Sequence, residues 1–151
     1  MGFKVISESP KAKFSACHFL KQPFKCSRLH GHNYYVTVEV SDKLDNNNFV
    51  IDFIELKKTL ISIIEPLDHY LLIPTESDYL KINEGEEYVE IIAQNKRYVI
   101  PRSDICFLPL RATTSELLAK YIHDKLKEIY RNKQIIVKVE ESKGSIALYE
   151  E

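Results

Sequence analysis

The spacing of apolar and polar residues predicts strands first along the chain and helices after them. Residues 3–7 and 13–19 predict two strands that pair with each other through a turn around Ser9 and Pro10. The run NYYVTVEV at residues 33–40 alternates and is rich in aromatic and β-branched residues, which is typical of a strand. The chain therefore begins with three predicted strands.

Two later stretches have helical periodicity. Apolar residues recur at helical spacing over residues 53–64, which predicts a helix that Pro66 ends. A second helix is predicted from Thr113 to about Tyr130, because Thr113 and Glu116 match the capping box that satisfies amides at a helix start. Both helices carry one apolar face, as helices that cover a sheet do.

The rest of the chain predicts further strands. Residues 135–141 and 145–149 predict a pair of strands around a turn at residues 143–144, and the long segment 73–110 lies between the two helices as an insertion. Within it, residues 88–93 and 97–100 predict a β-hairpin. This order predicts one α+β domain spanning residues 1–151, with a four-stranded antiparallel sheet, two helices on one face and an inserted β-hairpin.

Composition excludes several classes of protein. The 151 residues include 21 basic and 22 acidic ones, and this net charge of −1 argues against a sequence-independent nucleic-acid binder. The longest apolar runs are far shorter than the roughly 20 residues of a membrane span. Three cysteines are an odd number without framework spacing, which indicates free thiols and a cytoplasmic protein. The open edges of a small sheet favour oligomerisation.

A histidine pair gives the sharpest chemical signal. His30 and His32 flank Gly31 as a strand begins, so both imidazoles are expected on the same side of the sheet, and Gly31 leaves room for close backbone approach. His18 on a neighbouring strand would supply a third nitrogen. Three histidines without a fourth protein ligand describe an open catalytic zinc site. The alternative is a turn at residues 30–32 with His18 as a core histidine, and the pattern favours the metal.

The cysteines divide into two kinds. Cys17 and Cys106 stand among apolar residues and are expected to be small buried side chains. Cys26 lies between Lys25 and Arg28, and nearby positive charge raises the thiolate fraction of a cysteine. Cys26 is therefore a candidate base or nucleophile.

Two carboxylates complete the candidates. Asp68 precedes His69, and a carboxylate beside an imidazole can orient it for proton transfer, although adjacent residues need not touch. Alternation places Glu141 on the apolar face of its strand, where burial without a partner would be costly, and Glu140 on the opposite face. Glu141 is therefore the functional candidate of the pair.

Taken together, the motifs CSRLHGHNY, FSACHFL, LDH, TTSELLA and VEES resemble one family, the 6-pyruvoyl-tetrahydropterin and 6-carboxytetrahydropterin synthases of the tunnelling fold. The resemblance spans nearly the whole chain and implies a role for each candidate. By it, zinc would bind His18, His30 and His32; Cys26 would be the catalytic base, assisted by Asp68 and His69; and Glu141, Thr114 and Ser115 would bind the pterin.

The resemblance also implies a reaction and an assembly. The substrate would be 7,8-dihydroneopterin triphosphate, and the enzyme would be a homohexamer of two trimers with active sites between subunits. Three residues separate Cys26 from His30, a spacing that resembles the branch that forms 6-carboxytetrahydropterin, acetaldehyde and triphosphate in the deazapurine (queuosine and archaeosine) pathway. The insertion looks like that of archaeal relatives. Lys13, Lys25 and Arg28 are the nearest candidates to meet the triphosphate.

Three alternatives stay open at this point. The reaction could stop at 6-pyruvoyl-tetrahydropterin, a zinc hydrolase could use the same three histidines, and a non-catalytic pterin-binding oligomer could share the fold. A hydrolase gives no reason for Glu141, and a binding protein would tolerate the loss of Cys26 or His69.

Overall fold

The computed structural model describes residues 2–21 and 24–151, and the chain divides into two compact units. The first unit contains Met1–Phe14, Asn33–Pro66 and Ser115–Glu151, and the second contains Ser15–His32 and Leu67–Thr114.

Nine strands and two α-helices are present in the described residues. In chain order they are β1 (Phe3–His18), β2 (His30–Asp42), α1 (Phe53–Ile64), β3 (Tyr70–Pro74), β4 (Leu80–Glu84), β5 (Tyr88–Ala93), β6 (Lys96–Pro101), β7 (Ile105–Leu108), α2 (Ser115–Ile129), β8 (Gln134–Ser142) and β9 (Ser145–Glu150). Short 3₁₀ helices occupy Phe24–Ser27, Glu65–Leu67 and Arg102–Asp104.

The main sheet confirms the α+β class but has six strands, in the order β7-β3-β1-β2-β8-β9. The predicted four-stranded antiparallel sheet is therefore wrong. β2, β8 and β9 are antiparallel neighbours, whereas β3 runs parallel to β1 and β7 runs parallel to β3. The two added strands read YLLIP and ICFL, short apolar runs without the alternation that marks a half-exposed strand.

The predicted hairpin at the N-terminus is also wrong, because β1 is one strand of 16 residues that includes Pro10. Proline lacks the N–H that a central strand needs and is tolerated where one edge of a strand carries no ladder. β3 pairs with β1 at Ala16 and Cys17, well away from Pro10, so proline removes no bond to β3 there.

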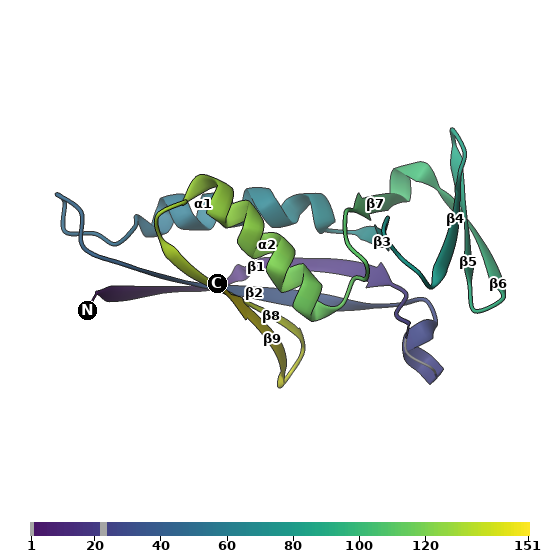
Figure 1. Ribbon diagram of the computed structural model, residues 1–151, viewed down its shortest axis with the longest axis horizontal. Helices are drawn as coiled ribbons and strands as arrows, with labels where there is room; N and C mark the ends of the chain where they lie inside the picture. Colours follow the sequence, from purple (N-terminus) through teal and green to yellow (C-terminus); the bar gives the residue numbers. More distant parts are fainter. Residues whose placement is uncertain (1, 22–23) are drawn as a thin grey trace. The chain divides into compact units, whose positions relative to one another are not determined.

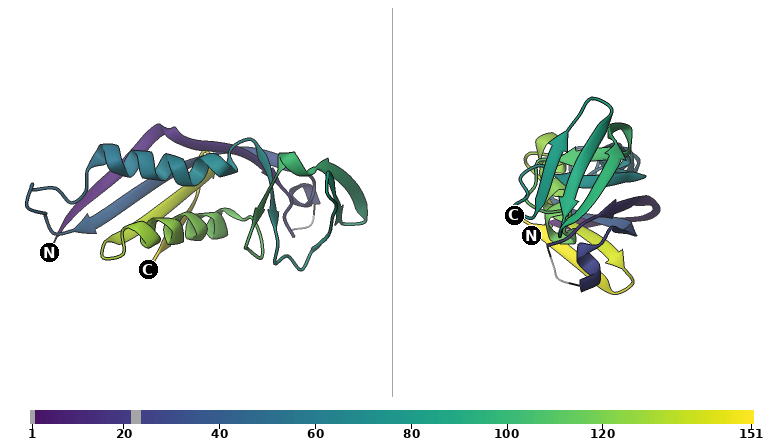
Figure 2. Two further views of the ribbon diagram at one scale, coloured as in Figure 1. Left: turned by 90° about the horizontal axis from the view of Figure 1, so that it is seen from above. Right: turned by 90° about the vertical axis from the view of Figure 1, so that its right-hand side faces the viewer.

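The first unit confirms two helices on one face of its strands (Figures 1 and 2). α1 has the predicted bounds, and its N-cap Asp52 accepts hydrogen bonds from the N–H groups of Ile54 and Glu55 at 2.7 and 3.0 Å. α2 begins at Ser115, two residues after the threonine assigned to the capping box, so that box is wrong. Thr113 contacts His18 instead.

The second unit contains the insertion. The predicted hairpin of β5 and β6 is confirmed, and its turn residues Gln94 and Asn95 both have positive φ angles, of 47° and 64°. β4 pairs with β5 and extends the hairpin to a three-stranded sheet. One face of this sheet joins a buried apolar cluster formed by Phe19, Leu71, Ile73, Leu80, Val89, Ile91, Ala93 and Ile105.

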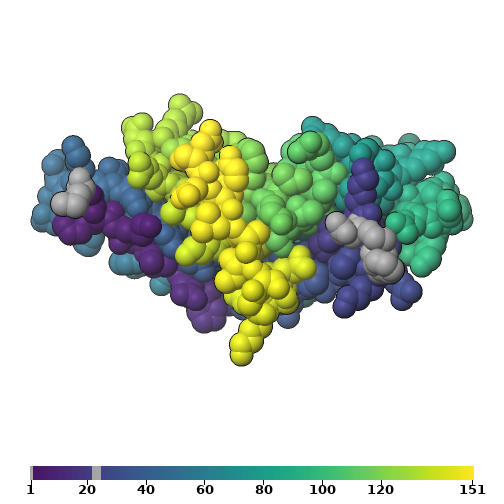
Figure 3. Space-filling model, turned by 60° about the horizontal axis from the view of Figure 1, so that its bottom comes forward, coloured from purple at the N-terminus to yellow at the C-terminus, as the bar shows by residue number. Residues whose placement is uncertain are grey.

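The predicted strand pair near the C-terminus is confirmed as β8 and β9, which turn at Gly144 with a φ of 85°. β9 is an edge of the main sheet. It lies at the surface in Figure 3 (yellow), with Ile146 and Leu148 at least half exposed. Within the described residues, no helix has the length and apolar character needed to cross a membrane.

Candidate functional site

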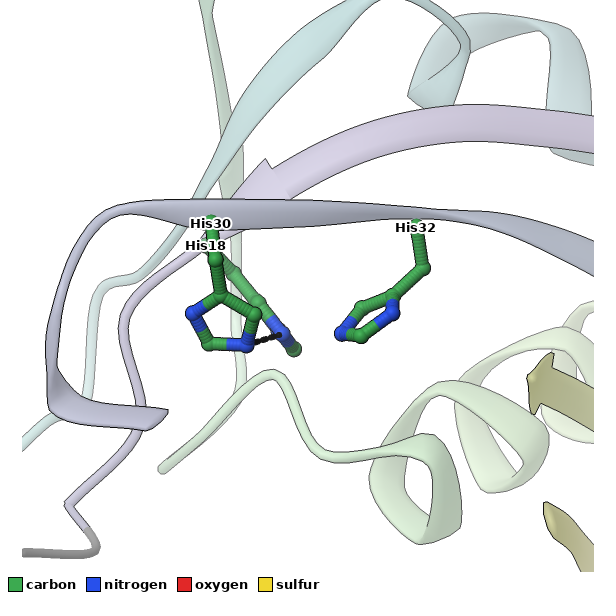
Figure 4. Close-up of side chains that lie close together, drawn as sticks. All are labelled: His18, His30 and His32. Atoms are coloured by element: carbon green, nitrogen blue, oxygen red, sulfur yellow. Dashed lines mark hydrogen bonds between the residues drawn. The ribbon is translucent and has the colours of Figure 1, made fainter. Parts of the chain in front are cut away.

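The three predicted histidines lie together in the second unit. His18 is the last residue of β1, and His30 and His32 extend from the same side of β2 (Figure 4). One ring nitrogen from each lies within 4.8 Å of the others, so the group could hold a metal ion. His18 is fully buried, and the other two are partly buried.

Backbone carbonyls fix the tautomers of two of these rings. His18 Nδ1 lies 2.8 Å from the Thr113 carbonyl oxygen, and His30 Nδ1 lies 2.7 Å from that of Arg28. A carbonyl oxygen only accepts, so each Nδ1 carries the proton and each Nε2 presents a lone pair. Metal-binding histidines are oriented in this way by their other ring nitrogen.

The two Nε2 atoms of these rings are placed as ligands of one cation. The Nε2 atoms of His18 and His30 are 3.2 Å apart (dashed in Figure 4). Two lone pairs facing at that distance repel, and a cation between them makes the contact favourable. Imidazole nitrogens suit zinc among the common biological metals. The donor set therefore fits a metal ion held through Nε2.

Gly31 allows this arrangement, as expected from its place between the two histidines. A Cβ atom on Gly31 would lie 2.7 Å from the carbonyl oxygen of Ala16 and 3.3 Å from Cα and Cβ of Cys17. Real Cβ atoms do not approach a backbone oxygen so closely. The missing side chain therefore lets β2 lie close to β1 at the point where the triad forms.

Asp68 and His69, which need not touch as sequence neighbours, are in contact. Asp68 Oδ2 lies 2.9 Å from His69 Nδ1, and Asp68 Oδ1 accepts a hydrogen bond from the Ser15 N–H at 2.8 Å. The His69 N–H donates to the Ser15 carbonyl at 2.6 Å. His69 adopts a left-handed backbone conformation, with φ of 65°, and its side chain is 79% exposed. Ser15 thus fixes both residues and leaves the imidazole accessible.

The three cysteines are free thiols, as predicted. Burial raises the pKa of Cys17 and of Cys106, so both remain protonated and chemically quiet. Cys26 lies in the 3₁₀ helix Phe24–Ser27, is partly exposed, and accepts a backbone hydrogen bond from Leu20 at 3.0 Å. All three cysteines are partly exposed, so burial does not set Cys26 apart, and its basic sequence neighbours Lys25 and Arg28 still mark it as the candidate.

The first unit pairs two of the predicted pterin-binding residues. Ser115, the first residue of α2, donates a hydrogen bond from Oγ to Glu141 Oε2 at 2.8 Å. Glu141 lies in β8, where the register with β9 shifts between Glu140 and Ser142. Glu141 is half-buried, so the cost expected from placing it near the apolar face is offset by a partner. Thr114 directly precedes this helix.

Sequence reasoning missed the groups that orient the triad. Thr113 matched a helix cap but contacts His18 through its carbonyl oxygen and through Oγ1, which lies 3.3 Å from Nδ1. Arg28 also acts through its carbonyl oxygen. Every residue has a carbonyl group, so no sequence pattern marks these positions.

Comparisons with known proteins agree on one family. The profile of the family described as 6-pyruvoyl tetrahydropterin synthase matches residues 9–151. A Haemophilus influenzae protein named 6-carboxy-5,6,7,8-tetrahydropterin synthase is 30% identical over 155 residues, which cover 99% of each chain. A Methanocaldococcus jannaschii protein that carries this name provisionally is 33% identical over 121 residues, or 80% of this chain and 74% of its own.

A solved structure gives the same result. The crystal structure of 6-pyruvoyl tetrahydropterin synthase from Plasmodium vivax superposes on this chain with a TM-score of 0.92 at 28% sequence identity. The match covers 100% of this chain and 98% of that one.

Proposed function

Because the chain belongs to the 6-pyruvoyl tetrahydropterin synthase family, we propose that it is a zinc-dependent 6-carboxy-5,6,7,8-tetrahydropterin synthase. The chain is a lyase of the tetrahydropterin synthase type with the tunnelling fold. It would convert 7,8-dihydroneopterin triphosphate and water to 6-carboxytetrahydropterin, acetaldehyde and triphosphate. The product would feed the deazapurine pathway in the cytoplasm.

The observation that carries the metal part of this proposal is the pair of facing Nε2 atoms of His18 and His30. His18, His30 and His32 would hold a zinc ion, which as a Lewis acid acidifies positions next to a bound hydroxyl oxygen. The carbonyl groups of Thr113 and Arg28 keep two of the imidazoles in the metal-binding tautomer.

The chain's own residues would transfer protons and bind the pterin. The Cys26 thiolate would remove a proton from the substrate side chain, and its partial exposure allows that approach. His69, oriented by Asp68, would donate or accept a proton at a second position of the substrate. Glu141 would bind the guanidine-like edge of the pterin with two charge-assisted hydrogen bonds, with Ser115 holding one of its oxygens.

A second candidate is 6-pyruvoyl-tetrahydropterin synthase, which eliminates triphosphate from the same substrate and stops before the carbon–carbon cleavage. The P. vivax protein carries that name and covers the whole chain. The H. influenzae protein, of nearly equal length, carries the 6-carboxy name, which agrees with the three-residue spacing between Cys26 and His30.

Product analysis separates the two. The zinc-loaded protein is incubated with 7,8-dihydroneopterin triphosphate, and the products are identified by mass spectrometry. Acetaldehyde with 6-carboxytetrahydropterin supports the main proposal, and a 6-pyruvoyl product without acetaldehyde supports the second. Unchanged substrate, with the metal content confirmed, contradicts both.

Variants of two cysteines provide the matched control. Cys26→Ala should abolish turnover and retain zinc and pterin binding. Cys106→Ala removes a thiol of the same unit that burial keeps protonated, and it should leave turnover within about twofold. Full activity in Cys26→Ala would favour a hydrolase.

We also propose a homo-oligomer, with a hexamer of two trimers as the expected size. β9 is an unpaired edge within the described sheet and exposes Ile146 and Leu148 (Figure 3). An edge strand with exposed apolar side chains favours pairing with another chain. Light scattering coupled to gel filtration measures the mass, and a monomer at micromolar concentration would contradict this part.

A further inference from the structure

A line of hydrogen bonds leads from the metal triad into the insertion. His18 Nδ1–H points at the Thr113 carbonyl oxygen and Oγ1, at 2.8 and 3.3 Å. The Tyr79 hydroxyl also lies beside the N–H and hydroxyl groups of Thr113, which lower the pKa of Tyr79 against the larger effect of burial. The Tyr79 hydroxyl donates to the carbonyl oxygen of Phe19, the residue after His18, at 3.0 Å.

His18 is thus held at two points. Thr113 contacts its ring, and Tyr79 holds the backbone carbonyl of the next residue. Rotation of the His18 ring would break its contacts with Thr113, and displacement of the backbone after His18 would break the bond to Tyr79. Such networks restrict a side chain more than one hydrogen bond does.

Tyr79 is itself well held. Its ring packs against the apolar cluster that contains Phe19 and Leu80, and its backbone N–H donates to Ser77 Oγ at 3.2 Å. Burial raises the pKa of Tyr79, so its hydroxyl stays protonated and remains a donor at neutral pH. The apolar cluster thus holds the Tyr79 ring in place, and the Tyr79 hydroxyl bonds the backbone carbonyl of the residue after His18.

We propose that Tyr79 is a positioning residue for the metal centre, through which the insertion fixes the orientation of His18 by way of Thr113 and Phe19. The insertion then has a role at the metal centre, because Tyr79 lies within residues 73–110. All four residues belong to the second unit. This inference rests on the proposed metal site and deepens it.

The test is metal binding, measured without substrate. The zinc dissociation constant is determined by competition with a chromogenic chelator, and the visible absorption of the cobalt-substituted protein reports the ligand geometry. Tyr79→Phe removes the hydroxyl alone and should weaken zinc binding about tenfold, because loss of a group that orients a ligand typically costs 10–100-fold in affinity. The cobalt bands should shift or broaden.

Tyr88→Phe is the matched control. Tyr88 begins β5 of the same insertion and is 55% exposed, so loss of its hydroxyl should leave the zinc constant within about twofold and the cobalt spectrum unchanged. Thr113→Val keeps the carbonyl and the shape but removes the hydroxyl, and should reproduce the effect of Tyr79→Phe in part. If both residues act on His18 together, the loss of zinc affinity in the double variant should be smaller than the product of the two single losses.

The outcomes separate this inference from the proposed function. If the unsubstituted protein binds zinc and neither Tyr79→Phe nor Thr113→Val changes the constant or the spectrum, the inference is wrong and the proposed function stands. If the unsubstituted protein does not bind zinc through the triad, both are wrong. If Tyr79→Phe does not fold, Thr113→Val decides alone by the same two readouts.

Discussion

Ser115 Oγ lies 2.8 Å from Glu141 Oε2, so the first residue of α2 holds a carboxylate at the end of β8. Glu141→Gln keeps the size of the side chain and an oxygen acceptor for Ser115 but removes the charge. Because charge-assisted hydrogen bonds are worth about 1.5–3 kcal/mol, binding of a pterin such as neopterin should weaken by about 10–100-fold. Calorimetric titration measures the constant.

The neighbouring Glu140→Gln serves as its control. Glu140 lies one residue away in β8, is paired in register with Tyr35 of β2, and was predicted to face the other way. Its substitution should leave pterin affinity within about twofold, and neither variant should lose bound metal. Equal losses for the two would contradict a specific role for Glu141.

Gly31→Ala should weaken both the fold and the metal centre. The added Cβ would stand 2.7 Å from a backbone oxygen, so β1 and β2 must separate locally. Such overpacking costs about 1–3 kcal/mol, and the separation moves His30 and His32 away from His18. Urea unfolding of the metal-free protein measures the stability, and chelator competition measures the metal affinity.

Gly144→Ala separates these two effects. Gly144 has a φ of 85°, and a Cβ there meets open space, so the variant should lose about 1 kcal/mol of stability from backbone strain alone. Its metal affinity should not change. A comparable loss of metal affinity in both variants would show that global stability, and not local geometry, controls the site.

Asp68→Asn tests proton transfer by the Asp68–His69 pair. The amide oxygen can still accept the Ser15 N–H, whereas the charge that faces His69 Nδ1 is lost. Because a positioned acid or base contributes about 10²–10⁴-fold, kcat should fall at least about 100-fold with KM and zinc content unchanged. Steady-state kinetics and metal analysis measure this. His69→Asn should cause a similar fall, and the double variant should add little.

A surface aspartate gives the comparison for this pair. Asp78→Asn breaks an exposed contact with Lys21 in the same unit, and kcat should stay within about twofold. A normal kcat in Asp68→Asn would remove Asp68 from the mechanism.

Glu39 should make stability depend on acidity. Its carboxylate is 8% exposed and accepts hydrogen bonds from Lys138 and from Lys4, and these bonds, that from Lys138 first, lower its pKa below the ordinary 4.5. A lowered pKa in the folded state stabilises the protein fully above that ordinary value. The stabilisation is lost as the pH falls through the lower, folded-state pKa.

Glu39→Gln should therefore reduce the urea midpoint at pH 7, and its difference from the unsubstituted protein should narrow steadily below pH 4.5. Glu84→Gln disrupts a pair with Arg102 in which both side chains are about half exposed, so its effect should be small at either pH. A Glu39→Gln difference that stays constant with pH would show that packing, and not charge, is what Glu39 contributes.

Local patterns predicted the elements whose signal lies within their own residues. Helical spacing predicted α1 with its bounds, alternation predicted β2, and two short runs on either side of residues 94–96 predicted the β5–β6 hairpin. The additional parallel strands β3 and β7 depend on partners distant in sequence, and five- and four-residue apolar runs do not specify which strand they will pair with. Pro10 predicts a turn from its residue type alone, because the sequence does not show that β3 pairs with β1 only near Ala16 and Cys17.

The candidate site shows the same division. The HxH spacing predicted His30 and His32 on one side of a strand, with His18 on the neighbouring strand, and the three lie together in the structure. The roles of Thr113 and Tyr79 depend on a carbonyl group and on one hydroxyl from the insertion, and they follow only from the tertiary structure.

The division of the chain into two units has a practical consequence for genetic work on it. The chain passes from one unit to the other after Phe14, His32, Pro66 and Thr114, and the first two of these points lie inside β1 and β2. No contiguous gene fragment encodes either unit, and a truncation that removes one would also cut a strand of the other. The histidine triad therefore has to be studied in the full-length polypeptide, by substitution instead of by dissection.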